Sequence, residues 1–249
     1  LVYTVVMDSA EGIFEYFVDA HTGAIYLKVD RLQTQNGISA EGTGVLGDGK
    51  KVNVSQRPAW GVYVARDEQR PVTISTYDFG FDWSRLFDLI ERRGRPAEGQ
   101  LASDPDNVWT DRAVVDVHTY MGWTYDYLYE RFGREGLDGR NGHIFAVANV
   151  FYPEDYYRVP ESIRRYFCNA FWSSDLGGFV TGNGYPSFLD QECGPLAGSF
   201  GIVAHELGHG LTRATSNLQY RNESGALYEA FSDILGNGAV WFHQENNSG

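Results

Sequence analysis

Residues 204–212 read AHELGHGLT, and this stretch decides how the rest of the chain is interpreted. His205 and His209 are four residues apart, so on a helix both imidazole rings project from one face. That spacing lets the two rings reach one tetrahedral metal ion, and zinc is the metal that such a helix most often holds. Glu206 lies beside the first histidine, where a carboxylate can hold a water molecule and accept its proton. A zinc-dependent hydrolase is therefore the first hypothesis.

Residues 222–233, NESGALYEAFSD, supply what the first stretch lacks. Ser224 is a good N-cap residue and no proline follows, so a second helix is predicted to begin there. Glu229 and Asp233 share one face of that helix. Glu229 can be the third protein ligand of a zinc ion, and Asp233 can accept the outer N–H of a liganding histidine and set its tautomer. A solvated acidic helix face is the plain alternative, and the histidine pair upstream weighs against it.

Together the two stretches resemble thermolysin and its relatives, the gluzincin family of zinc metalloendopeptidases. The resemblance implies that His205, His209 and Glu229 are the zinc ligands and that Glu206 is the general base. It also implies that Tyr220 helps to stabilise the tetrahedral intermediate of peptide hydrolysis. A partly buried aromatic residue with a satisfied hydroxyl group accounts for Tyr220 equally well.

The fold class that the resemblance implies is α+β, as in the thermolysin-like N-terminal domain. An antiparallel β-rich lobe with a long helix is expected first, followed by two helices that carry zinc. Apolar residues recur every three or four positions from Val114 to Phe132, which predicts the long amphipathic helix. His118 lies on it and is interpreted as a packing residue rather than a ligand.

Residues 168–172, CNAFW, resemble the family's edge strand, which pairs with the backbone of an extended peptide substrate. Asn169 and Ala170 are therefore expected to hold a peptide or protein substrate in register. A plain aromatic-rich strand explains the last two residues of the stretch but not this pair. By the same resemblance, Leu196 and Ile202 are expected to line an apolar side-chain pocket.

The chain divides into two predicted parts. Alternating apolar residues predict three strands in the first part, at residues 2–7, 14–19 and 24–27. The sequence YFVDAHTG at 16–23 resembles the end of the family's propeptide, so residues 1–35 are predicted to be the C-terminal tail of a propeptide. In the family this propeptide assists folding and covers the active site, so it is an expected partner. Residues 33–42 contain few large apolar side chains and two glycines, which is typical of a linker. Residues 36–249 are predicted to be the N-terminal catalytic domain, without the family's helical C-terminal domain.

Composition restricts the partners. The 249 residues carry a formal net charge of −13, which argues against a nucleic-acid partner. No stretch approaches the roughly 20 apolar residues that cross a bilayer. The chain begins without a methionine or signal peptide, so it is interpreted as a piece of a longer, secreted precursor. Cys168 and Cys193 are either a disulfide or two buried thiols.

Calcium is the second metal that the resemblance suggests. Residues 104–107, DPDN, resemble one of the family's surface calcium sites, although an ordinary turn has the same composition. Gly201 and Val240 stand where thermolysin has calcium-binding carboxylates. The buried double-calcium site of that enzyme is therefore not expected here.

The predicted function is zinc-dependent hydrolysis of internal peptide bonds by a protein secreted as a proenzyme. The main alternative is a catalytically incomplete zinc-binding module or an inhibited zymogen fragment, since the family's C-terminal domain contributes an arginine and a histidine to catalysis. Another zinc hydrolase, such as an aminopeptidase, would require an amine-recognising carboxylate cluster near the motif, and no such motif is evident.

Overall fold

The computed structural model describes residues 2–9, 12–30, 37–189 and 191–246, and it contains two compact units, Leu1–Asn36 and Gly37–Gly249. The first unit is an antiparallel sheet of β1 (Val2–Ser9), β2 (Gly12–Asp19) and β3 (Ile25–Asp30). Asp19 shapes the turn after β2, because its carboxylate accepts hydrogen bonds from the backbone N–H groups of His21 and Thr22 at 2.8 and 2.7 Å. The three strands predicted for this part of the chain are confirmed.

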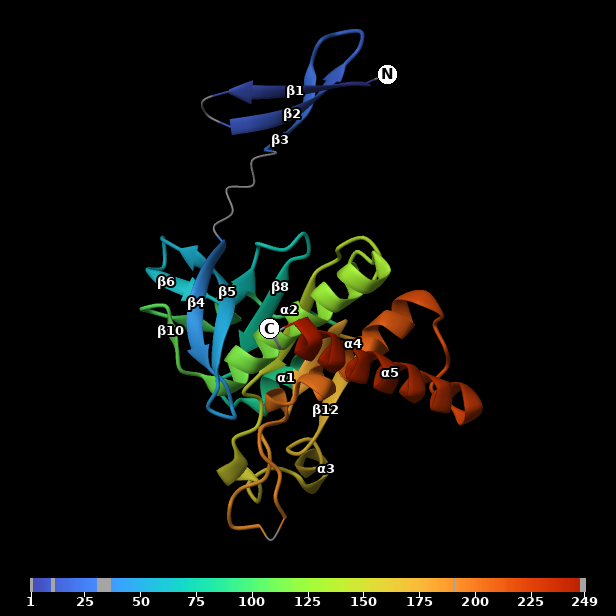
Figure 1. Cartoon of the computed structure of the whole chain (residues 1–249). Helices are drawn as coiled ribbons and strands as arrows, with labels where there is room; N and C mark the ends of the chain where they lie inside the picture. Colours follow the sequence, from blue (N-terminus) through green and yellow to red (C-terminus); the bar gives the residue numbers. More distant parts are fainter. Residues whose placement is uncertain (1, 10–11, 31–36, 190, 247–249) are drawn as a thin grey trace. The chain divides into compact units, whose positions relative to one another are not determined.

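The second unit has two five-stranded sheets and is drawn with its helices in Figure 1. The strand orders are β10-β4-β5-β6-β9 and β12-β13-β11-β8-β7. The strands are β4 (Gly37–Thr43), β5 (Gly49–Arg57), β6 (Val62–Val64), β7 (Arg66–Asp67), β8 (Ile74–Asp78), β9 (Ser103–Asp104), β10 (Val108–Trp109), β11 (Ile144–Ala148), β12 (Ala170–Ser173) and β13 (Gly178–Thr181). The α-helices are α1 (Trp83–Glu91), α2 (Arg112–Phe132), α3 (Glu161–Arg164), α4 (Phe200–Thr215) and α5 (Asn222–Asn246). Three short 3₁₀ helices complete the unit: η1 (Glu98–Gln100), η2 (Pro153–Asp155) and η3 (Leu196–Gly198).

The α+β class is confirmed, but the strand pairing is mixed rather than antiparallel throughout. Three strand pairs are parallel, namely β4–β10, β8–β11 and β11–β13. Parallel neighbours require a long crossover connection, and α1 and α2 lie in the connection between β8 and β11. In the described ranges, no helix combines the length and the apolar character needed to cross a membrane.

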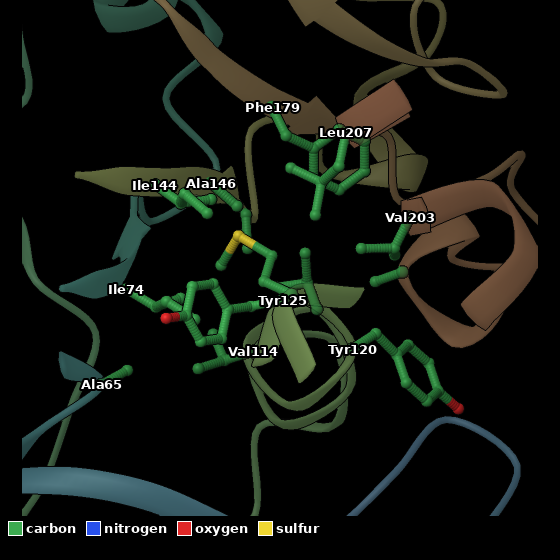
Figure 2. Close-up of a cluster of buried hydrophobic side chains, with 14 of the residues drawn as sticks. Ala65, Ile74, Val114, Tyr120, Tyr125, Ile144, Ala146, Phe179, Val203 and Leu207 are labelled. Atoms are coloured by element: carbon green, nitrogen blue, oxygen red, sulfur yellow. The ribbon is translucent and has the colours of Figure 1, made fainter. Parts of the chain in front are cut away.

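The long helix α2 forms the centre of this unit. Asp111 caps its start by accepting the N–H of Val114 at 3.0 Å, and Gly133 ends it in the left-handed conformation with a φ of 62°. Figure 2 shows its apolar side chains packed between the second sheet and α4. His118 is buried on α2 and bridges Thr76 and the carbonyl of Asn53 at 2.9 and 2.8 Å, so its predicted packing role is confirmed.

The linker predicted at residues 33–42 is wrong for its second half. Residues 31–36 lie outside the described part of the chain, but Gly37–Thr43 form β4, which pairs with β5 and β10. Its glycines serve close packing: a Cβ on Gly42 would lie 2.6 Å from a methyl of Val115, and one on Gly37 would overlap the side chain of Gln69. The glycines that suggested a flexible linker are the residues that let β4 pack closely against its neighbours.

A buried ion pair joins α2 to the β4–β5 turn. The Lys50 ammonium lies 2.6 Å from the Asp116 carboxylate, and their side chains are 2% and 0% exposed. Asp116 also accepts the N–H of Val45 at 2.7 Å. Burial alone would lower the pKa of Lys50, but its hydrogen bonds to Asp116 and Asp48 outweigh that effect and raise it. Lys50 is therefore charged in the folded protein and depends on these partners.

We expect Asp116→Ala to lower the free energy of unfolding by about 3–5 kcal/mol, because it removes the buried partner of a buried charge. Asp48→Ala is the matched control: Asp48 also contacts Lys50, but its side chain is 51% exposed, so a loss below about 1 kcal/mol is expected. Urea unfolding measures both. Equal losses would contradict the assignment of Asp116 as the main partner.

We expect stability to fall as the pH drops from 6.5 toward 4, partly because of His143. Burial, with repulsion from Arg66 and Arg95, lowers the pKa of His143 from 6.5 to about 4. In that window the unfolded chain binds the proton and the folded chain does not, so acidification favours unfolding. His143→Gln should flatten the dependence by up to about 1.4 kcal/mol per pH unit in unfolding measured at several pH values. An unchanged slope in the variant would show that other groups cause the effect.

Candidate metal centre

Helices α4 and α5 lie side by side (Figure 1) and approach each other through glycines. A Cβ added at Gly208 would lie 2.9 Å from the Cα of Ser232, and one added at Gly236 would lie 2.8 Å from the carbonyl oxygen of Gly201. No larger residue fits at either position without movement of the backbone. Because the two helices are so close, Glu229 on α5 lies next to His205 and His209 on α4.

His205, His209 and Glu229 each direct one ligand atom to a common point. These atoms all lie within 4.8 Å of one another, and no other group of this kind is found among the described residues. The two Nε2 atoms are 3.1 Å apart, and the Glu229 carboxylate lies 3.3 Å from Nε2 of His205 and 3.7 Å from Nε2 of His209. Two imidazoles and one carboxylate are the donor set of an open tetrahedral zinc site.

Residues of α5 determine the tautomer of both histidines. The Nδ1–H of His205 donates to the Asp233 carboxylate at 2.9 Å. Ser232 donates its hydroxyl proton to the carbonyl oxygen of Tyr228 at 3.2 Å, so it accepts from the Nδ1–H of His209 at 2.9 Å. Both neutral rings therefore keep an unprotonated Nε2, which is the atom that a metal requires.

The donor set fits a divalent cation. With both rings in this tautomer, the two Nε2 atoms face each other at 3.1 Å with a carboxylate beside them, so three electron pairs converge on one point. Such an arrangement is repulsive unless a proton or a cation lies at the centre. Imidazole nitrogens with one carboxylate favour zinc over calcium, which prefers oxygen ligands alone.

Glu206 is buried beside this cluster. Its carboxylate accepts the backbone N–H of Trp172 at 2.8 Å and is 3.9 Å from Nε2 of His209. Burial, together with the negative charge of Glu229, raises the pKa of Glu206 to about 8, although the hydrogen bond from Trp172 opposes that shift. A cation held by the neighbouring ligands would favour the charged carboxylate and lower this pKa. Glu206 is thus placed where a proton can be accepted and later returned.

The cluster lies between two hollows of the surface. We name the larger one, of about 790 Å³, the Tyr220 cavity, and the smaller one, of about 470 Å³, the Ile202 cavity. The predicted site residues that line the Tyr220 cavity are Asn169, Ala170, His205, Glu206, His209, Tyr220 and Glu229. Those that line the Ile202 cavity are Asn169, Ala170, Leu196, Ile202, His205, Glu206 and Asp233. All ten residues predicted from the sequence therefore border these two adjoining hollows, which share Asn169, Ala170, His205 and Glu206 and which we call together the cleft.

The wall opposite α4 is the edge strand β12, as the sequence indicates. It pairs only with β13 in the described sheet, so its other edge has no strand partner. A disulfide joins Cys168 to Cys193, with Cα atoms 6.0 Å apart, which decides between the two alternatives left open for these cysteines. The bridge immediately precedes Asn169 and connects the start of the wall to the segment that leads into η3.

Two residues that support the site were not predicted. Ser232 orients His209, and Tyr228 stacks on the His209 ring at 4.9 Å while its hydroxyl donates to the His209 carbonyl at 2.9 Å. Tyr228 is one residue before Glu229 and Ser232 is three residues after it, so on a helix both lie near the face that carries Glu229. This spacing is the sequence signal that could have identified them. The start of α5 was also predicted wrongly. The helix begins at Asn222, because Gly225 already donates to Arg221 at 3.0 Å and the Ser224 hydroxyl donates to carbonyls instead of capping.

The segment at residues 104–107 forms a turn. Asp104 accepts the backbone N–H groups of Asp106 and Val108 at 3.0 and 3.2 Å, and Asp106 also accepts that of Val108 at 3.0 Å. These hydrogen bonds show that the clustered carboxylates stabilise a turn. Calcium binding at this turn stays a prediction. Gly201 and Val240 lie opposite each other, 3.7 Å from a Cβ built on Gly201 to a methyl of Val240.

A family profile described as the thermolysin metallopeptidase catalytic domain matches residues 39–213. This range includes His205, Glu206 and His209, and it ends before Glu229. Among curated proteins, the chain is 36% identical over 230 residues to a bacillolysin of Brevibacillus brevis, covering 92% of the chain and 37% of that protein. It is 34% identical over 249 residues to the thermostable neutral protease NprT of Geobacillus stearothermophilus, covering 95% and 40%.

An extracellular elastase of Staphylococcus epidermidis is 32% identical over 224 residues, covering 88% of the chain and 38% of that protein. The chain thus spans about two fifths of the length of the curated relatives it matches. Among solved structures, the precursor of protealysin, a metalloproteinase from Serratia proteamaculans, superimposes with a TM-score of 0.52 at 23% identity. That match covers 70% of this chain and 45% of the other, and it supports the fold alone.

We expect Gly208→Ala to weaken metal binding although residue 208 touches no ligand atom. The new methyl would collide with the Ser232 backbone and separate α5 from α4, which displaces Glu229 and the partners of both histidines. Loss of such orienting contacts typically weakens metal affinity by about 10–100-fold. Zinc affinity is measured by competition with a chromophoric chelator.

Gly201→Ala is the matched control, because it adds the same methyl to the same helix with 3.7 Å of clearance. We expect it to leave zinc affinity unchanged. If both variants bound zinc as the unsubstituted chain does, the close approach at Gly208 would not determine the geometry of the ligands.

Proposed function

Because the chain belongs to the thermolysin metallopeptidase family, we propose that it is the zinc-binding part of an endopeptidase that hydrolyses internal peptide bonds. One observation carries the proposal: two imidazole nitrogens and a carboxylate converge beside a buried glutamate, next to the edge of β12 that has no strand partner. Nucleophile activation, proton transfer and substrate alignment each have a candidate group in one cleft.

His205, His209 and Glu229 are the proposed zinc ligands, with Asp233 and Ser232 holding the two rings in orientation. Bound by these residues, zinc would supply a Lewis acid for the scissile carbonyl and make a water molecule acidic enough to attack.

Glu206 is the proposed general base. It accepts a proton from the attacking water and delivers it to the nitrogen of the leaving amine. Tyr220 lines the same cavity, and its hydrogen bond to Glu229, with burial and nearby negative charge, raises its pKa. The phenol therefore stays protonated, and its one O–H donor would turn from Glu229 to the oxyanion as that charge develops.

Strand β12 is the proposed docking edge for the substrate backbone. An extended peptide can add to a free strand edge through main-chain hydrogen bonds, with alternate side chains entering pockets on either side. Asn169 and Ala170 border both cavities, so they are suited to hold the peptide across the metal cluster. Leu196 and Ile202 give the Ile202 cavity an apolar wall that favours an apolar substrate side chain.

We further propose that residues 1–35 are the tail of a propeptide and that the protein is secreted as a proenzyme. The compact unit Leu1–Asn36, the disulfide and a relative named extracellular elastase support this assignment. The negative net charge supports peptides rather than nucleic acid as substrates. A zinc-binding module that needs a further domain for catalysis is the second candidate, favoured by the two-fifths coverage of the relatives.

We expect Glu206→Gln to retain zinc near one ion per chain and to lose hydrolysis almost completely, because the amide cannot accept the proton. Elemental analysis measures the metal, and cleavage of an end-blocked internal peptide with and without chelator measures the activity. Full activity in the variant would remove Glu206 from the mechanism.

The unsubstituted chain distinguishes the two candidates in the same assay. Zinc with chelator-sensitive cleavage supports the endopeptidase, and zinc without cleavage supports the module that needs another domain. Absence of zinc binding would contradict both. Calcium is tested by adding it to the zinc-loaded protein and measuring the unfolding temperature.

A further inference from the structure

The two halves of the cleft differ in charge. The Ile202 cavity lies toward the start of α4, and its lining residues include no lysine or arginine. The Tyr220 cavity lies toward the end of α4, and its lining includes one arginine, Arg213. Arg213 also lines a neighbouring hollow of about 240 Å³, so its side chain lies where the two spaces meet.

A neutral partner holds Arg213 in place. Its guanidinium donates to the side-chain oxygen of Asn217 at 2.6 Å. Asn217 has a φ of 48° and donates its N–H to the carbonyl of Thr212 at 2.9 Å, so it closes the end of α4 in a left-handed conformation. Within the described residues, no carboxylate forms an ion pair with Arg213. The guanidinium therefore retains donors for a negatively charged ligand.

Position at a helix end explains part of this arrangement, because a cation there interacts favourably with the helix dipole. It does not explain the arginine's place in the cavity wall that also contains the metal ligands. The molecule as a whole has a net charge of −13 and repels acidic peptides. Within the cleft, a local cation is needed to overcome this repulsion of acidic peptides.

We propose that Arg213 is a specificity-determining residue that binds an aspartate or glutamate side chain of the peptide substrate on the N-terminal side of the cleaved bond. This inference rests on the proposed peptidase function and names part of its substrate class. The recognising chemistry is a hydrogen-bonded ion pair between the guanidinium and the carboxylate.

The direction follows from strand β12. Cys168, just before β12, lines the Ile202 cavity, whereas Trp172 and Ser174 line the Tyr220 cavity. The strand therefore runs from the Ile202 cavity to the Tyr220 cavity. Antiparallel pairs outnumber parallel ones about two- to three-fold, so an added peptide is expected to run the opposite way. Its N-terminal half then lies in the Tyr220 cavity, beside Arg213.

The test uses end-blocked peptides that differ only in having Glu, Gln or Lys at one position N-terminal to the cleaved bond. The zinc-loaded 249-residue chain should cleave the best-placed Glu peptide about 2–5-fold faster in kcat/KM than its Gln counterpart, as expected for a solvent-accessible ion pair. The preference should decline at high salt. Arg213→Gln should remove it, and Arg213→Glu should reverse it in favour of Lys.

Arg221→Gln is the matched control. Arg221 is exposed, is absent from the lining of both cavities, and its replacement changes the net charge equally. We expect the Glu preference to persist in this variant. Equal loss in Arg213→Gln and Arg221→Gln, no preference in the unsubstituted chain, or a preference confined to the C-terminal side would each overturn the proposal.

A binding measurement separates this proposal from the proposed function. Fluorescently labelled Glu and Gln peptides are titrated with zinc-loaded Glu206→Gln protein, with and without Arg213→Gln, and anisotropy is recorded. A Glu preference that depends on Arg213 supports the assignment even if the unsubstituted chain cleaves nothing, in which case only the peptidase function fails. Equal binding of both peptides to Glu206→Gln protein that contains Arg213 contradicts the assignment even if cleavage is robust.

Discussion

The close approach of α4 and α5 is the constraint on which the site depends. Backbone meets backbone at Gly208 and Gly236, and this contact determines how far α5 lies from the histidine face. Glu229, Ser232 and Asp233 then reach their partners without any loop having to be ordered. Elements that are rigid in themselves hold ligand atoms more accurately than loops do. The ligand geometry is therefore a property of helix packing, which the core of Figure 2 supports from the other side of α4.

Electrostatics and packing reinforce one another here. Helix packing brings two nitrogen lone pairs and a carboxylate together, and burial raises the pKa of Glu206 to about 8 in their company. Each of these features is unfavourable by itself, and each is relieved by one cation at the same point. The same cation would lower the pKa of Glu206 and prepare it to accept a proton. In the proposed mechanism, metal binding and activation of Glu206 would thereby be coupled through charge rather than through a change of shape.

The sequence predicts the local geometry of α4 better than it predicts the packing around that helix. Residues four apart lie on the same face of a helix, so the proximity of His205 and His209 could be inferred from their spacing alone. Ser232 and Tyr228 could not be assigned, because their roles depend on the rotation of α5 against α4. The segment Gly37–Thr43 was misjudged for a related reason: composition cannot distinguish glycines that loosen a chain from glycines that admit a neighbour. The mixed strand order likewise depends on long-range pairing that no local pattern contains.

The disulfide keeps the chain in one molecule after proteolytic cleavage between the two cysteines. Cys168 and Cys193 close a covalent ring that contains β12, β13 and the exposed Phe188, a residue that is 58% accessible. Exposed loop tips are the preferred places for proteolytic nicking. A single cut anywhere between the two cysteines would open the ring but leave both fragments in one molecule. The wall of the cleft would then remain attached after damage that would release it from an unbridged chain.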